Sequence, residues 1–144
     1  MEITNILVPF DGSSYSIKAF NAALDIAKRN DAKIQVLTCL EKENLGAWYV
    51  DKRVNKKIIK DAKIFAMKFL LELEETAKKW DVLLSVHILE VKSISNGIVS
   101  FANSKKINLI IIGSHGHTGF NRFILGSVSN AVSQSAKCPV LIIK

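Results

Sequence analysis

Two hydrophobic patterns alternate along this chain, and together they predict strands separated by helices. Five short runs are rich in branched apolar residues and are bounded by turn-forming residues, which is typical of β-strands. These runs cover residues 3–10, 33–40, 82–91, 108–113 and 139–144. The run at 108–113 is hydrophobic on both faces, which indicates a central strand covered from both sides.

The segments between these runs place apolar residues three and four positions apart, as in an amphipathic helix. The first such helix covers 14–30, with Ser13 or Ser14 as its N-cap. Residues 41–55 are interpreted as a loop, and a long helix follows. Its predicted buried stripe is Ile58, Ala62, Phe65, Phe69, Leu73, Ala77 and Trp80. Two later helices are marked by Ile94, Ile98, Phe101 and Ala102, and by Val128, Ala131, Val132 and Ala136. This alternation predicts an α/β fold with a parallel sheet between layers of helices.

The chain has 144 residues and no repeat, low-complexity tract or linker, so we expect one domain over 1–144. No segment reaches the about eighteen consecutive apolar residues of a membrane helix. The first residues also lack the basic region of a signal peptide. We therefore expect a cytoplasmic protein without a membrane association. Cys39 and Cys138 have no metal-ligand spacing and are interpreted as small buried hydrophobic residues.

The net charge of +7 raises the question of nucleic-acid binding. Much of the basic excess lies between Lys52 and Lys68, within the long predicted helix. We interpret it as a solvated helix face, which attracts polyanions only weakly. No aromatic–basic interleaving, helix-turn-helix or zinc pattern accompanies it, so we expect no specific nucleic-acid partner.

The stretch 110–132 runs from the fourth predicted strand, through a glycine-rich segment, into the last helix. Its glycines are Gly113, Gly116, Gly119 and Gly126. Glycines let backbone N–H groups approach a bulky anion, and a helix that begins near Ser127 adds unpaired N–H groups and a positive dipole end. Ser127 and Ser129 lie in its first turn. The pattern fits a phosphate-binding loop, and it fits equally well an ordinary surface loop with Ser127 as N-cap.

The glycine spacing differs from two common phosphate-binding motifs. No lysine follows in the Walker A register, and the glycines follow the fourth strand rather than the first, unlike the dinucleotide fingerprint. In open α/β sheets, ligands bind beyond the carboxyl ends of the strands where the strand order reverses. If the first strand neighbours the fourth, the loops after Phe10 and Ile112 face each other across such a crevice.

The spacing G-x2-G-x9-G-S, preceded by "IIIGSHGHTG" and followed by "SVSNAVSQSAKCPVLIIK", closely resembles the universal stress protein family. The opening "NILVPFDGSSYSIKAFNAALDIAKRNDAKIQVLTCL" is similar to the first strand, helix and second strand of that family. The likeness runs from Ile3 to Lys144 and is least clear over 41–80. It implies a Rossmann-like three-layer sandwich with a five-stranded parallel sheet in the order 3-2-1-4-5.

Members of that family with the full glycine motif bind ATP or AMP, and this chain has every position of the motif. The resemblance implies that phosphates lie at Gly113, Gly116, Gly126, Ser127 and the backbone of Val128. Mg²⁺ is the expected companion ion of these phosphates. It also implies that Pro9 and Asp11 meet the adenosine. The Asp11 carboxylate can accept ribose hydroxyls, although aspartate in "DGS" is also a common turn former. Cys39 aligns near the adenine contact, where the family usually has valine.

The complete expected nucleotide-binding set is Pro9, Asp11, Cys39, Gly113, Gly116, His117, Gly119, Arg122, Gly126, Ser127, Val128 and Ser129. His115 and His117 have no carboxylate or thiolate nearby in sequence, so we expect polar loop residues near phosphate rather than metal ligands. Arg122 either reaches terminal phosphates or forms a salt bridge at the surface or a dimer interface. Trp48 and Tyr49 are expected to pack on the following helix rather than cover the base. His87 is expected to be a half-exposed residue on an edge strand.

The last strand, "VLIIK", is a long apolar sheet edge protected only by Lys144, which favours association. The family resemblance implies a homodimer through this strand. We therefore expect a sensor or switch that binds an adenine nucleotide and signals to an unknown protein partner. The alternative is a slow ATPase or phosphotransferase in the same crevice. No general base or nucleophile–base pair is evident, so no catalytic residue is assigned.

Overall fold

The strands form one parallel sheet in the order β3-β2-β1-β4-β5, which confirms the predicted topology. The computed structural model describes residues 1–41, 52–117 and 125–144. Its elements are β1 (Asn5–Pro9), α1 (Ser14–Asn30), β2 (Lys33–Glu41), α2 (Lys52–Trp80), β3 (Leu84–Val91), α3 (Ile94–Ser104), β4 (Leu109–Gly113), α4 (Ser127–Ser135) and β5 (Val140–Ile143). Strand and helix alternate along the chain, as the two hydrophobic patterns predict.

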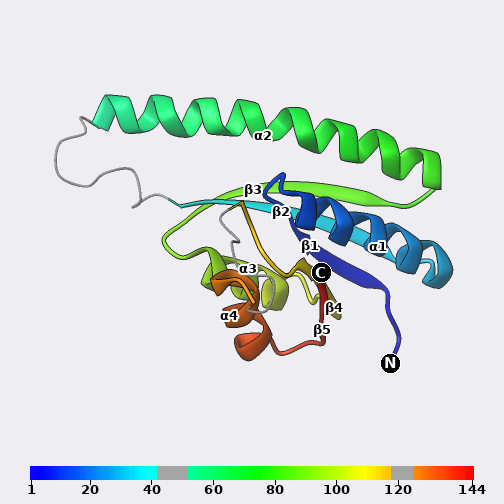
Figure 1. Ribbon diagram of the computed structural model, residues 1–144. Helices are drawn as coiled ribbons and strands as arrows, with labels where there is room; N and C mark the ends of the chain where they lie inside the picture. Colours follow the sequence, from blue (N-terminus) through cyan, green and yellow to red (C-terminus); the bar gives the residue numbers. More distant parts are fainter. Residues whose placement is uncertain (42–51, 118–124) are drawn as a thin grey trace.

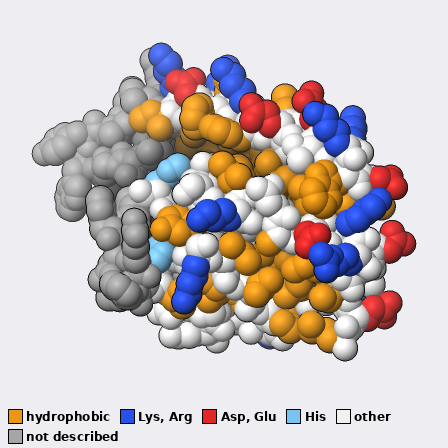
Figure 2. Space-filling model, turned by 45° about the vertical axis from the view of Figure 1, so that its right-hand side comes forward, with side chains coloured by type: hydrophobic (Ala, Val, Ile, Leu, Met, Phe, Trp, Pro, Cys, Tyr) orange, Lys and Arg blue, Asp and Glu red, His pale blue; other side chains and the backbone are white. Residues whose placement is uncertain are grey.

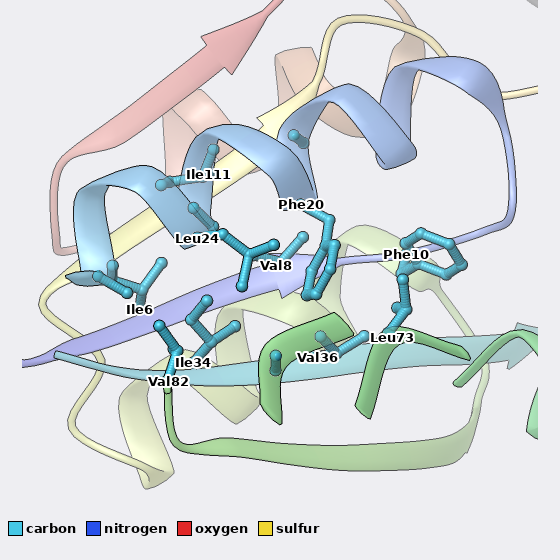
Figure 3. Close-up of a cluster of buried hydrophobic side chains, with 14 of the residues drawn as sticks. Ile6, Val8, Phe10, Phe20, Leu24, Ile34, Val36, Leu73, Val82 and Ile111 are labelled. Atoms are coloured by element: carbon cyan, nitrogen blue, oxygen red, sulfur yellow. The ribbon is translucent and has the colours of Figure 1, made fainter. Parts of the chain in front are cut away.

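Helices cover both faces of the sheet, with α1 and α2 on one side and α3 and α4 on the other (Figure 1). Successive residues of a strand point to opposite faces, so β1 supplies both layers. Ile6 and Val8 pack under α1 and α2, whereas Leu7 packs under α3 and α4. Figure 3 shows the first of these layers, where Phe20 of α1 lies over the sheet.

The strand order reverses at β1, which has β2 on one side and β4 on the other. Ile6 pairs with Ile34 of β2 and with Leu109 of β4. Because both pairings are parallel, the carboxyl ends of β1 and β4 lie side by side. The turn after Pro9 and the loop after Gly113 therefore meet at the crevice where α/β folds bind ligands.

Helix α2 departs most from the prediction. It already begins at Lys52, inside the segment predicted as a loop. Its 29 residues extend over about 43 Å, longer than the about 30 Å of the nine-residue β2, so part of it extends past the sheet (Figure 1). Leu73 and Ala77 are buried as predicted, but Phe65 is 64% exposed.

Two further members of the predicted α2 stripe, Ile58 and Trp80, are also exposed, and Leu70, outside the predicted stripe, is fully buried. Along the top of Figure 2, where α2 lies, hydrophobic side chains alternate with charged ones. Within the described ranges, no helix is long and apolar enough to cross a lipid bilayer.

A row of polar side chains crosses the α3 side of the sheet near the amino ends of its strands. His87 of the edge strand β3 is half-buried, as predicted, and its Nε2 lies 2.7 Å from Gln35 Oε1. The Asn5 side chain accepts from Gln35 and donates to the carbonyl of Lys105. Burial, assisted by the positive charge of Lys105, lowers the pKa of His87 from its ordinary value of 6.5.

Candidate functional site

A cavity of about 680 Å³ opens at the carboxyl end of the sheet, beside the point where the strand order reverses. This volume is in the range of small-molecule sites. The predicted residues that line it are Pro9, Asp11, Cys39, Gly113, Gly116, His117, Gly126, Ser127, Val128 and Ser129. The predicted residues Gly119 and Arg122 lie outside the described residues, as do Trp48 and Tyr49.

The N-terminus of α4 forms one wall of the cavity. Gly126 is its N-cap, and a glycine has no side chain with which to cap the helix. Gly126 N–H donates to the Ser114 carbonyl at 2.8 Å, and Asn130 N–H donates to the Gly126 carbonyl at 2.9 Å. The N–H groups of the first turn between them have no partner within the helix. This wall therefore presents backbone donors and a positive dipole end to the cavity.

The two predicted serines of α4 have different surroundings. Ser129 is 2% exposed, and its hydroxyl donates to the Ser114 carbonyl at 2.8 Å and to the Gly126 carbonyl at 3.0 Å. Its proton thus holds the loop against the helix. Ser127 is exposed to the cavity, and no described residue forms a hydrogen bond with its hydroxyl. Of the two, only Ser127 has a hydroxyl available to a ligand.

The glycines of the motif lie where an added side chain would be crowded by its neighbours. A Cβ on Gly126 would lie 3.1 Å from the Ser114 oxygen. A Cβ on Gly113 would lie 2.8 Å from the backbone carbon of Tyr15, so this glycine lets α1 pack against the end of β4. At Gly116 the added Cβ would lie 2.8 Å from Oδ2 of Asp11.

Asp11 lies on the opposite wall, in the turn between β1 and α1. Its Oδ1 accepts from Ser13 N–H at 2.9 Å, and the following Gly12 has a φ of +81°. The aspartate is therefore a turn former, as its "DGS" context suggests. Its other carboxylate oxygen lies beside Gly116, at the boundary between the two loops.

The two histidines of the glycine loop contact different parts of the molecule. His117 Nε2 lies 2.6 Å from the main-chain oxygen of Asp11, so it joins the two loops across the crevice. His115 Nδ1 lies 3.0 Å from Ser114 Oγ, and its ring packs against Tyr15. In the part of the chain that the structure describes, no group of three or more metal-ligating side chains comes together.

The other end of the cavity is apolar. It is formed by Leu37 and Cys39 of β2 and by Ile94 and Ile98 of α3. Burial raises the pKa of the Cys39 thiol to about 11, so this thiol is neutral and adds apolar surface. A Cβ on Gly97 would lie 2.6 Å from Val91 Cγ1, so a glycine here permits close packing of α3.

Some lining residues were not predicted as site residues. They are Phe10, Ser16, Leu37, Ile94, Ile98, Ile112, His115 and Leu125. Most are apolar and belong to strand or helix stripes, which in a sequence look the same as core positions. The α3 residues reach the site only because the helix packs beside β2.

Comparison with known proteins gives consistent matches over the whole chain. The model of the universal stress protein family matches residues 2–144. A universal stress protein of Methanocaldococcus jannaschii is 33% identical over 145 residues, which cover 96% of this chain and 81% of that protein.

Solved structures share the fold as well. Universal stress protein UspA from Lactobacillus plantarum has a TM-score of 0.90 and 24% identity, with 100% of this chain and 99% of that chain covered. A universal stress protein from Archaeoglobus fulgidus in complex with dAMP has a TM-score of 0.70 and 24% identity, with 100% of both chains covered.

Proposed function

Because this chain belongs to the universal stress protein family, we propose that it binds an adenine nucleotide, ATP or AMP, in the cavity between β1 and β4. The observation that carries the proposal is the division of this cavity into two chemically different ends. The uncapped N-terminus of α4 supplies donors at one end, and Leu37, Ile94 and Ile98 supply apolar surface at the other. A nucleotide has the same division, with phosphates at one end and a flat base at the other.

In this proposal each wall recognises one part of the ligand. The first-turn amides of α4 and the Ser127 hydroxyl would hold the phosphates. Asp11 would accept hydroxyls of the ribose through the oxygen that Ser13 does not occupy. The apolar end would take the base, with the neutral Cys39 thiol as part of its surface. The dAMP bound by the Archaeoglobus fulgidus protein, which has the same fold, supports this choice of ligand class.

A magnesium ion would accompany a polyphosphate in this site. Asp11 is the carboxylate among the described lining residues, and Mg²⁺ is commonly held by one or two carboxylates together with substrate phosphates. Asp11 therefore fits a shared site in which the nucleotide supplies the other ligands. It does not fit a metal site that forms without nucleotide.

We propose that the protein acts as a cytoplasmic single-domain sensor, paired as a homodimer through β5, with a protein partner still to be identified. In the described part of the chain β5 pairs with β4 alone, and its Leu141 is 39% exposed. The loop at the cavity contacts this strand, because Ser114 N–H donates to the Ile143 carbonyl at 2.7 Å. A bound nucleotide would therefore shift the conformation of β5, the edge strand that pairs in the proposed dimer.

The alternative function is a slow ATPase or phosphotransferase. Asp11 favours it, since a carboxylate beside the phosphates could orient water or a metal ion. Against it, Ser114, whose hydroxyl contacts His115 Nδ1, is 2% exposed, and His117 contacts a main-chain oxygen rather than a nucleophile. A steady-state assay decides, because turnover above about one per second would be that of an ordinary enzyme.

The proposal is tested by identifying the ligand and measuring its affinity. Mass spectrometry of the purified protein is expected to release AMP or ATP. Calorimetry on ligand-stripped protein is expected to show saturable binding of both. Absence of binding at millimolar AMP and ATP, with or without Mg²⁺, would rule out the assignment.

A further inference from the structure

The hydrogen bond between His117 and Asp11 connects two segments that are 106 positions apart in the chain. It runs from Nε2 of His117 in the loop after β4 to the main-chain oxygen of Asp11 in the turn after β1, at 2.6 Å. We call this contact the 11–117 latch. Both residues line the cavity, so the latch lies at the site itself.

The chemistry of the latch fixes the proton on the imidazole. A carbonyl oxygen can only accept, so Nε2 must carry a hydrogen. In the neutral ring, Nδ1 is then an acceptor with a lone pair. A phosphate oxygen also only accepts, so a neutral His117 engaged in the latch has no donor left for phosphate. In this form of the ring, the latch and a hydrogen bond from His117 to a phosphate exclude each other.

The latch acts on a turn that is also bound to β2, because Phe10 N–H donates to the Leu37 carbonyl at 2.9 Å and the Phe10 carbonyl accepts from Thr38 Oγ1 at 2.8 Å. Asp11 Oδ1 is bound by Ser13 N–H of the same turn, and Gly12 adopts a φ of +81°. On the other side, Gly116 leaves room for the Asp11 carboxylate, because a Cβ there would lie 2.8 Å from Oδ2. His117 adds a hydrogen bond to the neighbouring loop, beside the packing of the His115 ring against Tyr15.

We propose that His117 is a positioning residue that holds the two walls of the site in their binding geometry. This inference rests on the proposed nucleotide function and deepens it. A ligand that bridges preorganised walls does not have to order them on binding, and preorganisation of this kind raises affinity. This gain in affinity depends on the preorganised walls of the site, so it should be the same whatever the number of phosphates on the ligand.

The test uses three ligands of increasing phosphate number: adenosine, AMP and ATP. Calorimetry compares the wild type with His117→Ala and His117→Gln. His117→Ala is expected to weaken all three ligands by a similar factor, about fivefold, which is the equilibrium effect of one lost hydrogen bond of about 1 kcal/mol. Glutamine has an uncharged N–H donor, so His117→Gln is expected to recover most of the affinity.

A role as phosphate ligand gives the opposite pattern. The loss of affinity in His117→Ala would then be larger for ATP than for AMP, and adenosine would bind as tightly as it does to the wild type. His117→Gln would not recover the affinity, because glutamine cannot replace a charged imidazole. That pattern overturns the proposal, and so does unchanged affinity in His117→Ala. Ser127→Ala is the internal control, because this variant should lose affinity for AMP and ATP but not for adenosine.

A second measurement tests the latch in the ligand-free protein. The ring nitrogens of His117 in ¹⁵N NMR are expected to report a proton on Nε2, and Ser13 N–H is expected to exchange faster in His117→Ala. A ring protonated at Nδ1 instead would overturn the latch even if nucleotides bind. If the wild type binds none of the three ligands, the proposed function fails, and this measurement still decides on the latch.

Discussion

Helices α1 and α4 both begin beside the cavity, but their first turns are satisfied in different ways. At α1, the Ser13 side chain caps the helix by accepting from Ser16 N–H at 3.2 Å. At α4, the N-cap is Gly126, and no side chain among the described residues replaces the missing acceptor. The start of α1 is closed, in that a side chain of its own turn accepts from a first-turn amide. The start of α4 is open, in that its first-turn amides have no side-chain cap from Gly126 and lie at the cavity.

The comparison shows how a fold can reserve a binding site at little cost in stability. Glycine at an N-cap is only a few tenths of a kcal/mol worse than serine. The open amides of α4 therefore cost little when the site is empty, and they remain available to an anion. The closed start of α1 contributes to stability instead. Changes at the two starts should accordingly affect different properties.

The largest effect is expected from Gly126→Val. Its Cβ would lie 3.1 Å from Ser114 O and 3.3 Å from His115 Cα, so the loop must shift and the open amides lose their geometry. Binding of AMP and ATP in calorimetry is expected to fall by about a hundredfold or more, a loss of about 3 kcal/mol or more. Gly126→Ala, which adds the Cβ alone, should be intermediate. Wild-type affinity in a folded Gly126→Val protein would contradict the role of α4.

A smaller effect is expected from Ser127→Ala, which removes an exposed hydroxyl and leaves the amides in place. A hydrogen bond to a charged group contributes about 1.5 kcal/mol or more, so affinity for AMP should fall about tenfold. Adenosine binding and thermal stability should not change. Equal losses for adenosine and AMP would indicate that the loop, rather than the hydroxyl, was disturbed.

Ser13→Ala tests the closed start of α1. Loss of this cap should lower the free energy of unfolding by about 1 kcal/mol, as measured by denaturant titration. The Ser13 N–H that donates to Asp11 is retained in alanine, so nucleotide affinity should remain within about twofold of the wild type. A strong loss of binding without a loss of stability would reverse the distinction between the two helices.

The smallest effect is expected far from the site, at His87. Burial lowers its pKa in the folded protein, so the unfolded chain binds more protons below pH 6.5. Stability should therefore be fully present above pH 6.5 and decline as the pH falls through that value. Denaturant midpoints at pH 8 and pH 5.5 should differ less in His87→Gln than in the wild type. Identical pH dependence in both proteins would exclude His87 as a cause.

The fold was predictable from the sequence because local patterns determine it. Strand runs such as 108–113 and the helix predicted over 14–30 correspond to the elements observed, and Ser13 is the cap. Helix α2 was predicted less well, since Phe65 continues a regular apolar spacing but is exposed, whereas Leu70, outside that spacing, is buried. Hydrophobic spacing indicates which face of a helix is apolar, but not which of its apolar positions the rest of the fold covers.

The candidate site was predictable where the motif is local and unpredictable where it depends on packing. Gly126 and Ser127 are recognisable because loop and helix start adjoin in sequence. The His117–Asp11 contact joins residues 106 positions apart, and Gly113 is needed because Tyr15 lies against it. Neither contact has a local signal. Both follow from the placement of β1 beside β4.

The most direct test of the account is a crystal structure of the protein with AMP. The account predicts that the phosphate accepts hydrogen bonds from first-turn amides of α4, with the base against Leu37 and Ile98 and the ribose beside Asp11. A phosphate bound elsewhere, with those amides facing solvent, would contradict it.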